Sequence, residues 1–146
     1  MHEQIKELLN RFPEWEGSFT ETQDDVWPYQ LISPTGDAKL MFSYYDRLVV
    51  RFERESIEFW AASEAFETLE NIINEKLVTI EYLIDRDLAK SLKQDIPDKI
   101  PSYMGGSLCV VSEIPETNRE WHFANTIKVT SWLGTHNSIK EAVYGA

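Results

Sequence analysis

Closely spaced carboxylates are the residues of this sequence whose types could support catalysis. Three such pairs occur: Asp24 with Asp25, Glu53 with Glu55, and Asp85 with Asp87. Two carboxyl groups that face each other across a cleft can hydrolyse a glycosidic bond, one as the acid and the other as base or nucleophile. With 25 acidic residues in 146, however, such pairs are expected by chance. A small carboxylate-dependent hydrolase is therefore the third interpretation, behind two binding functions.

Histidine and cysteine form no pattern that predicts a metal site or a nucleophile. The histidines, His2, His122 and His136, are far apart, and none has a cysteine or carboxylate at the spacing of metal ligands. Cys109 is the only cysteine and lies in an apolar segment, so we expect a buried, unreactive thiol. The sequence contains no Gly-x-Ser-x-Gly motif and no phosphate-binding glycine loop. We therefore predict no catalytic residue, no metal and no cofactor.

Acidity is the one unusual feature of the composition. Fourteen lysine and arginine residues face 25 aspartate and glutamate residues, which gives a net charge of −11. Residues 1–73 contain 15 acids and 6 bases (net −9), and residues 74–146 contain 10 acids and 8 bases (net −2). Such a charge repels nucleic acid and anionic lipid and attracts basic proteins. An acidic surface can also serve solubility alone. We expect neither nucleic-acid binding nor membrane binding.

The apolar content predicts a folded, soluble protein of the cytoplasm. Apolar residues make up 42% of the chain and aromatic residues 12%, which is enough for a core. No segment approaches the roughly 20 apolar residues of a membrane-spanning helix. The N-terminal segment contains Glu3 and Glu7 and lacks the basic start and apolar run of a signal peptide. A single cysteine also excludes an intrachain disulfide.

Two groups of residues are candidates for a protein-binding surface. The first is a dense acidic run from which we select Glu53, Glu55, Glu58, Glu67 and Glu70. Helical spacing places the last two on one outer helix face. The second group joins carboxylates to an aromatic ring in a predicted edge segment, and consists of Asp24, Asp25 and Trp27. Tyrosine and tryptophan are favoured anchors in protein interfaces. The alternative for both groups is an ordinary solvated surface.

An N-terminal helix, a block of strands and a second helix must position these residues. Apolar residues spaced i, i+3, i+4 and i+7 predict a helix over residues 5–12 that Pro13 ends. Alternating residues and turn sequences then predict strands over residues 19–23, 26–32, 38–45 and 48–53, continued by Ile57 and Phe59. An apolar stripe predicts the second helix, with Ser63 as its N-cap.

The second half of the chain is predicted to contain more strands. Apolar and β-branched residues indicate strands at 77–84, 107–114 and 126–132. Between them we expect a short helix over residues 85–95, with Leu88 and Leu92 pointing inward. A loop should follow over residues 96–106, with a turn at Gly105 and Gly106. Residues 137–144 are expected to form a last helical turn. No repeat or linker divides the chain, so we predict a single α+β domain over residues 1–146, an antiparallel sheet flanked by two or three helices.

Two segments of the chain carry a recognisable pattern. The first has Val-Val-Arg-Phe-Glu-Arg-Glu-Ser-Ile-Glu-Phe-Trp at positions 49–60, then a helix, then Leu-Val-Thr-Ile at positions 77–80. The second has Ile-Lys-Val-Thr-Ser-Trp-Leu-Gly-Thr at positions 127–135. Together they cover less than a third of the chain and resemble small bacterial immunity proteins of polymorphic or contact-dependent growth inhibition toxin systems. In that family a histidine usually stands where this chain has Glu58.

The resemblance implies a cytoplasmic protein that binds and blocks a cognate toxin, in many cases a nuclease. It implies structural roles for Val50, Phe52, Phe59 and Trp132 but assigns no binding residue, because the interface varies with the toxin. The two candidate groups above thereby become candidates for toxin binding, and their charge suits a basic toxin. An acidic adaptor or housekeeping domain that binds another protein is the second interpretation.

Overall fold

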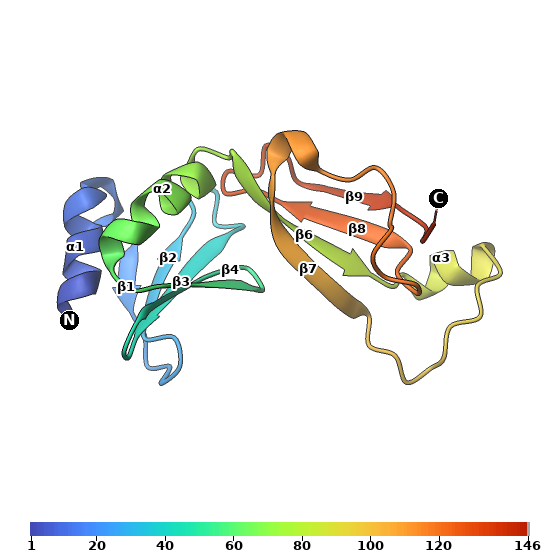
Figure 1. Cartoon of the computed structure of the whole chain (residues 1–146), viewed down its shortest axis with the longest axis horizontal. Coiled ribbons are helices and arrows are strands. Elements are labelled where there is room, and N and C mark those ends of the chain that lie inside the picture. The colour runs from blue at the N-terminus through green and yellow to red at the C-terminus, as the bar shows by residue number, and fades with distance from the viewer. Residues whose placement is uncertain (146) are drawn as a thin grey trace.

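The computed structural model describes residues 1–145, in which three α-helices flank two antiparallel sheets. This confirms the α+β class and the flanking helices. The strands of the described part divide between a five-stranded and a four-stranded sheet, where the sequence predicted one sheet. Figure 1 shows the sheets side by side, with α1 (Glu3–Arg11) and α2 (Ala62–Ile73) beside the first and α3 (Arg86–Ser91) at the far end of the second.

The first sheet contains five strands in sequence order, each antiparallel to the next: β1 (Phe19–Glu21), β2 (Tyr29–Ile32), β3 (Lys39–Tyr44), β4 (Leu48–Phe52) and β5 (Glu55–Phe59). Side chains alternate between the two faces of a strand. In β4 this alternation buries Leu48, Val50 and Phe52 in the core that the sheet shares with α1 and α2. Val49 and Arg51 therefore point to the opposite side, which we call the outer face.

A polar contact joins the two helices of this half. The side-chain oxygen of Gln4 accepts a 2.7 Å hydrogen bond from the backbone N–H of Ala62, in the first turn of α2. Ser63 lies inside the helix, so its predicted role as N-cap is wrong. Gln4 instead supplies an acceptor for one of the free N–H groups at this helix end. Pro13 follows α1 as predicted and begins a short 3-10 turn, η1 (Pro13–Trp15).

The second sheet has the strand order β7-β6-β8-β9, with β6 (Leu77–Leu83), β7 (Tyr103–Val110), β8 (Thr126–Thr130) and β9 (Ser138–Glu141). Its smaller core contains apolar side chains of the two central strands, among them Val78, Ile80, Tyr82, Ile127 and Val129. A 3-10 turn, η2 (Val111–Glu113), follows β7. This sheet therefore has an apolar core distinct from that of the first sheet.

The end of the chain and the glycine pair differ from the prediction. Residues 137–144 contain strand β9 instead of a helical turn, because pairing with β8 satisfies their backbone better than a marginal short helix would. Gly105 and Gly106 lie inside β7 and not in a turn. A Cβ atom at Gly105 would come within 2.2 Å of the Trp121 ring. The glycine is required here by this close approach, not by a turn.

Helix α3 is shorter than predicted, and different side chains face inward. Ala89 is its buried residue, while Leu88 is half-buried and Leu92 is exposed. The expectation that both leucines point into a core is therefore wrong. The helix ends at Ser91, and Leu92 is its C-cap residue with an exposed side chain.

Trp132 connects the two halves of the molecule. It follows β8 of the second sheet, yet its side chain is buried in the core of the first. The indole meets the ring of Phe52 edge-on, with 6.2 Å between the ring centroids. Val50 is buried in the same core, and Phe59 packs against it. Because a residue from one half of the molecule is buried in the core of the other half, there is a physical reason to expect one domain. The single domain over residues 1–146 itself stays a prediction.

Candidate protein-binding surface

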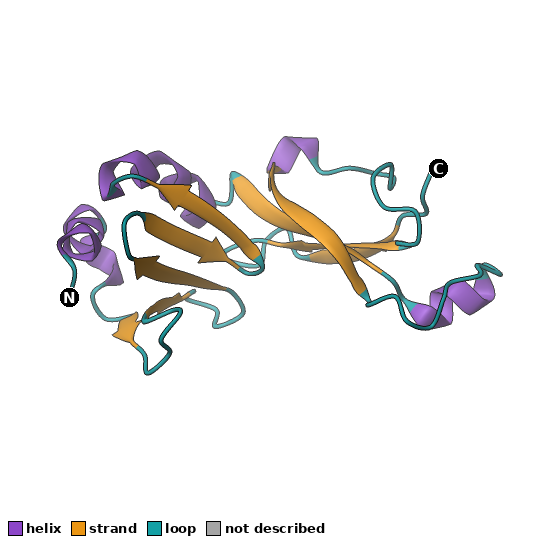
Figure 2. Ribbon diagram, turned by 60° about the horizontal axis from the view of Figure 1, so that its bottom comes forward, coloured by secondary structure: helices purple, strands orange, loops and turns teal. Residues whose placement is uncertain are grey.

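The acidic run of residues 53–70 does not form one continuous surface. Glu58 lies on β5 in register with Val49 and points to the outer face of the first sheet. Glu67 and Glu70 lie on α2, which packs on the other face. Figure 2 shows these helices on one side of the sheet and loops on the opposite side. A flat partner that contacts Glu58 would therefore not reach the carboxylates of α2.

Two of these carboxylates are paired with arginines. Glu70 forms an ion pair with Arg11 of α1, which ties the two helices together. Glu58 on β5 accepts a 2.8 Å hydrogen bond from Arg47, which directly precedes β4. Exposed pairs of this kind stabilise a fold by only about 0–1 kcal/mol, so they remain free to exchange for a partner's charges. Glu67 is exposed on the surface of α2 that points away from the core.

Two more glutamates of the run, Glu53 and Glu55, support the fold. Glu53 lies in the tight turn between β4 and β5 with a φ of 55°, and its carboxylate accepts a 3.4 Å hydrogen bond from the backbone N–H of Lys39. Glu55 accepts a 3.3 Å hydrogen bond from the hydroxyl of Tyr103 on β7. Burial and the nearby Glu55 carboxylate raise the pKa of Tyr103. Glu55 thus lies at a contact between the two sheets.

The second predicted group, Asp24, Asp25 and Trp27, lies in the loop between β1 and β2. One carboxylate oxygen of Asp24 accepts hydrogen bonds from the backbone N–H groups of Val26 and Trp27 at 2.8 and 2.9 Å. These bonds favour the charged form and hold the pKa of Asp24 below its ordinary value of 3.8. Thr22 completes the turn, because its hydroxyl donates to the carbonyl of Trp27 at 2.7 Å. The loop therefore has a defined conformation.

This loop folds against the outer face of the first sheet. The guanidinium of Arg51 on β4 lies 5.9 Å from the ring centroid of Trp27. The hydroxyl of Tyr45, in the turn after β3, donates a 3.5 Å hydrogen bond to the carbonyl of Asp25. Ser43 also points to this face and is buried although it is polar. These contacts bring the second predicted group to the same face of the sheet as Glu58.

Exposed aromatic side chains complete this surface, and the sequence did not identify them as site residues. Tyr45 is 76% exposed, Trp60 67% and Val26 61%, which are high values for large apolar side chains. The guanidinium of Arg47 lies 4.7 Å from the ring centroid of Trp60, beside Glu58. We call the whole set the outer-face patch; its members are Asp24, Asp25, Val26, Trp27, Tyr45, Arg47, Glu58 and Trp60.

The outer-face patch combines the features of a protein interface. Its exposed rings offer apolar area with few rotatable bonds, as interface anchors do. Its three carboxylates outnumber the two arginines of this face, Arg47 and Arg51, and the backbone hydrogen bonds from Trp27 and Val26 lower the pKa of Asp24. In the sequence, the signal was that each of these two aromatic residues directly follows a strand: Tyr45 follows β3 and Trp60 follows β5. Side chains that follow the last paired residue of a strand can escape the core.

Other residues with chemical potential have local roles. The Asp85 carboxylate caps α3 by accepting hydrogen bonds from the backbone N–H groups of Asp87 and Leu88 at 3.0 and 3.1 Å. Cys109 is half-buried in β7, and burial, with a smaller effect of the Glu113 carboxylate, raises the pKa of its thiol. Among residues 1–145, no group of three or more histidine, cysteine, aspartate or glutamate side chains is placed to hold a metal ion.

Two general findings complete the description of the site. No helix within residues 1–145 is long and apolar enough to cross a membrane. Comparison of the chain with protein families, with curated proteins and with solved structures found no match.

Proposed function

We propose that this protein neutralises a bacterial toxin by binding it directly, as an immunity protein does. The toxin domain is basic, and a nuclease with a cationic substrate groove fits this description. The outer-face patch is the surface that binds. The observation that carries this assignment is the arrangement of Tyr45 and Trp60, both mostly exposed, beside carboxylates at one face of a sheet.

Charge and aromatic area contribute differently to such binding. A net charge of −11, concentrated in residues 1–73, attracts a basic partner from a distance and speeds the encounter. Affinity then depends on a few large side chains that become fully desolvated in the complex. Tyr45 and Trp60 are suited to this role. Glu58 can exchange its pairing with Arg47 for a cation of the toxin.

Co-expression tests this function. The gene that precedes the immunity gene is expected to encode the toxin, and its expression should arrest growth unless this protein is present. Replacing both Tyr45 and Trp60 with alanine should abolish rescue and the isolated complex. Ile139 is a matched control, because it is 72% exposed on β9 of the second sheet, outside the patch. Ile139→Ala should rescue growth fully.

Three outcomes would oppose the proposal in different ways. If the double alanine variant still rescues growth, the patch is not the binding surface. If a complex forms without rescue, the adaptor interpretation is favoured. If the neighbouring gene product is harmless and does not bind, toxin neutralisation is wrong.

A further inference from the structure

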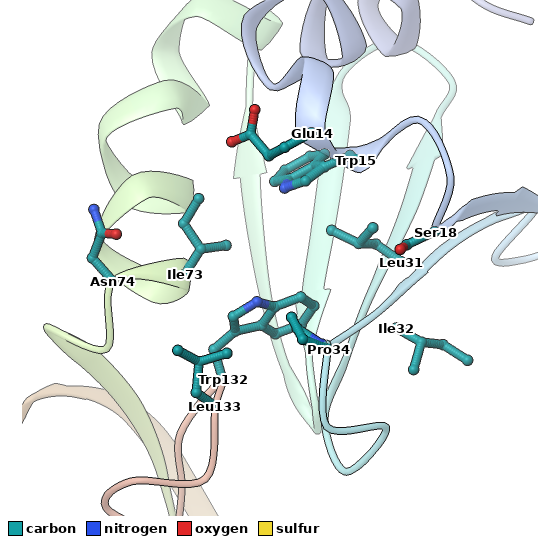
Figure 3. Close-up of a pocket in the computed structure, with 10 residues that line it drawn as sticks. All are labelled: Glu14, Trp15, Ser18, Leu31, Ile32, Pro34, Ile73, Asn74, Trp132 and Leu133. Atoms are coloured by element: carbon teal, nitrogen blue, oxygen red, sulfur yellow. The ribbon is translucent and has the colours of Figure 1, made fainter.

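A small pocket lies where the two halves of the molecule meet, away from the outer-face patch. Figure 3 shows the indole rings of Trp15 and Trp132 on opposite sides of this pocket, with Ile73 and Leu31 between them. Trp15 belongs to η1, and Trp132 follows β8. The pocket has a volume of about 280 Å³. This lies just below the usual range for small-molecule sites, roughly 300–1,000 Å³.

The walls of the pocket are already fixed by packing. The Trp15 ring stacks on Phe12 with 4.3 Å between centroids, and the Trp132 ring packs edge-on against Phe52. Both tryptophans are only 4% exposed. Their positions are therefore set before any ligand enters, which reduces the entropy lost on binding.

Both indole N–H groups can donate a hydrogen bond to a ligand in this pocket. In Figure 3 the nitrogen of each ring lies on the edge turned toward the space between the rings. The indole nitrogen of Trp121, by contrast, is enclosed by protein and has no hydrogen-bond partner. A tryptophan N–H is a donor only. A ligand that displaces water from this pocket must therefore offer an acceptor to these rings or leave a donor unsatisfied.

The surroundings determine which kind of acceptor fits. Glu14 lies at the rim with its carboxylate directed away from the space between the rings, and its charge, like the net charge of −11, opposes an anionic ligand. A cation would gain from Glu14 but would leave both indole donors unsatisfied. The remaining walls are mostly apolar, with Leu31, Ile73 and Leu133 among them. A neutral oxygen acceptor on an apolar skeleton satisfies both requirements.

We propose that this pocket binds a neutral carbonyl group carried on a compact apolar skeleton, with the carbonyl oxygen accepting hydrogen bonds from the indole N–H groups of Trp15 and Trp132. A small ketone or amide has this chemistry, and so has the backbone carbonyl beside an aliphatic side chain of a protein. The pocket shares no residue with the outer-face patch. This inference is therefore independent of the proposed function.

Nuclear magnetic resonance of the 15N-labelled full chain tests the proposal directly. Each of the five tryptophans gives one indole N–H signal. Cyclohexanone should shift the signals of Trp15 and Trp132 downfield in a saturable way and leave the other three in place. Two probes with the same ring provide the controls, cyclohexylammonium and cyclohexanecarboxylate, and both should bind at least about fivefold more weakly, the factor that corresponds to one neutral hydrogen bond.

Variants that remove a donor but retain a ring sharpen the test. Trp15→Phe and Trp132→Phe should each weaken cyclohexanone binding about fivefold. Trp60→Phe is the matched control, because this indole is exposed on the outer-face patch, and it should have no effect. N-acetyl-leucine methylamide serves as the peptide probe. If it binds more tightly than cyclohexanone, the natural source of the carbonyl is a protein chain; the reverse order assigns a free small molecule.

Two results would overturn the inference, and neither depends on the variants being folded. The first is that no indole signal of the wild-type protein shifts with either carbonyl probe. The second is that cyclohexylammonium binds more tightly than cyclohexanone and loses this binding in Glu14→Gln. The site would then select a cation through Glu14.

Discussion

The carboxylate of Glu75 accepts a 2.6 Å hydrogen bond from the hydroxyl of Thr135, which lies 60 residues away in the chain. Its second oxygen accepts hydrogen bonds from the backbone N–H groups of Leu133 and Thr135 at 3.2 and 3.1 Å. Glu75 itself has a φ of 60°, in the turn from α2 into β6. One side chain therefore holds the loop that places Trp132 in the core of the first sheet.

Removing the Glu75 carboxylate should destabilise the whole protein. We expect Glu75→Ala to lower the free energy of unfolding by about 2 kcal/mol, because hydrogen bonds to a charged group are each worth roughly 1.5–3 kcal/mol and the loop can regain some from water. Glu75→Gln keeps one acceptor oxygen and should cost less. Urea denaturation measures both variants. Equal stability of Glu75→Ala and wild type would show that the loop is held by its own bonds alone.

The contribution of Glu75 should depend on pH. Burial opposes its charge, but the hydrogen bonds from Thr135 and Leu133, with the Ser131 hydroxyl nearby, prevail and hold its pKa below the ordinary value of 4.5. The unfolded chain therefore binds a proton more readily than the folded chain does. This stabilisation is present above about pH 4.5 and is lost as the pH falls through the folded pKa. The stability difference between wild type and Glu75→Gln should shrink over that interval in urea titrations.

Trp132 should couple the unfolding of the two sheets. Trp132→Ala leaves a cavity in the core of the first sheet, and substitutions of this kind typically cost about 3–5 kcal/mol. In wild type, methyl signals of Leu69 and Ile127, one from each core, should disappear at the same urea concentration. In Trp132→Ala the signal of Leu69 should disappear first. Separate transitions in wild type would instead contradict the single domain.

Gly105 should tolerate no side chain, because β7 passes directly over Trp121. A Cβ atom there would lie 2.2 Å from the ring, so Gly105→Ala must displace the indole or the strand. Overpacking of this kind typically costs about 1–3 kcal/mol. Gly17→Ala is the matched control, since a Cβ at Gly17 meets no atom within 4 Å. Thermal unfolding should distinguish the two, and an unchanged melting temperature for Gly105→Ala would refute the contact.

Local patterns were sufficient to predict the first half of the fold. Alternation identified β4, and helical spacing identified α1 and α2, because each buries one face against a single core. The second half depended on distant contacts. β9 is a strand because β8 lies beside it, and the glycines of β7 are explained only by Trp121. No local pattern contains that information.

The candidate site was predictable in part for the same reason. Asp24, Asp25 and Trp27 were selected as carboxylates beside a ring in a predicted edge segment. The strand begins only at Tyr29, so all three lie in the loop before it, and the fold brings them to the same face as Glu58. The sequence could not show that Glu58 and the glutamates of α2 lie on different surfaces, because they are separated only by the folded sheet that lies between them. It also gave Glu75 no role, since the hydrogen bonds of Glu75 come from residues about 60 positions later.

Association with the toxin should be faster at low ionic strength. The charges of the outer-face patch should contribute more to this rate enhancement than charges elsewhere on the molecule. Asp25→Asn and Glu64→Gln remove the same charge, but Glu64 lies in the first turn of α2, behind the sheet. We expect Asp25→Asn to slow association up to about fivefold at low salt, since a charge pair 4 Å apart in water is worth about 1 kcal/mol. Glu64→Gln should have a smaller effect, and high salt should remove both. Stopped-flow rates that fall equally in the two variants would indicate that net charge alone attracts the toxin and that the patch does not orient it.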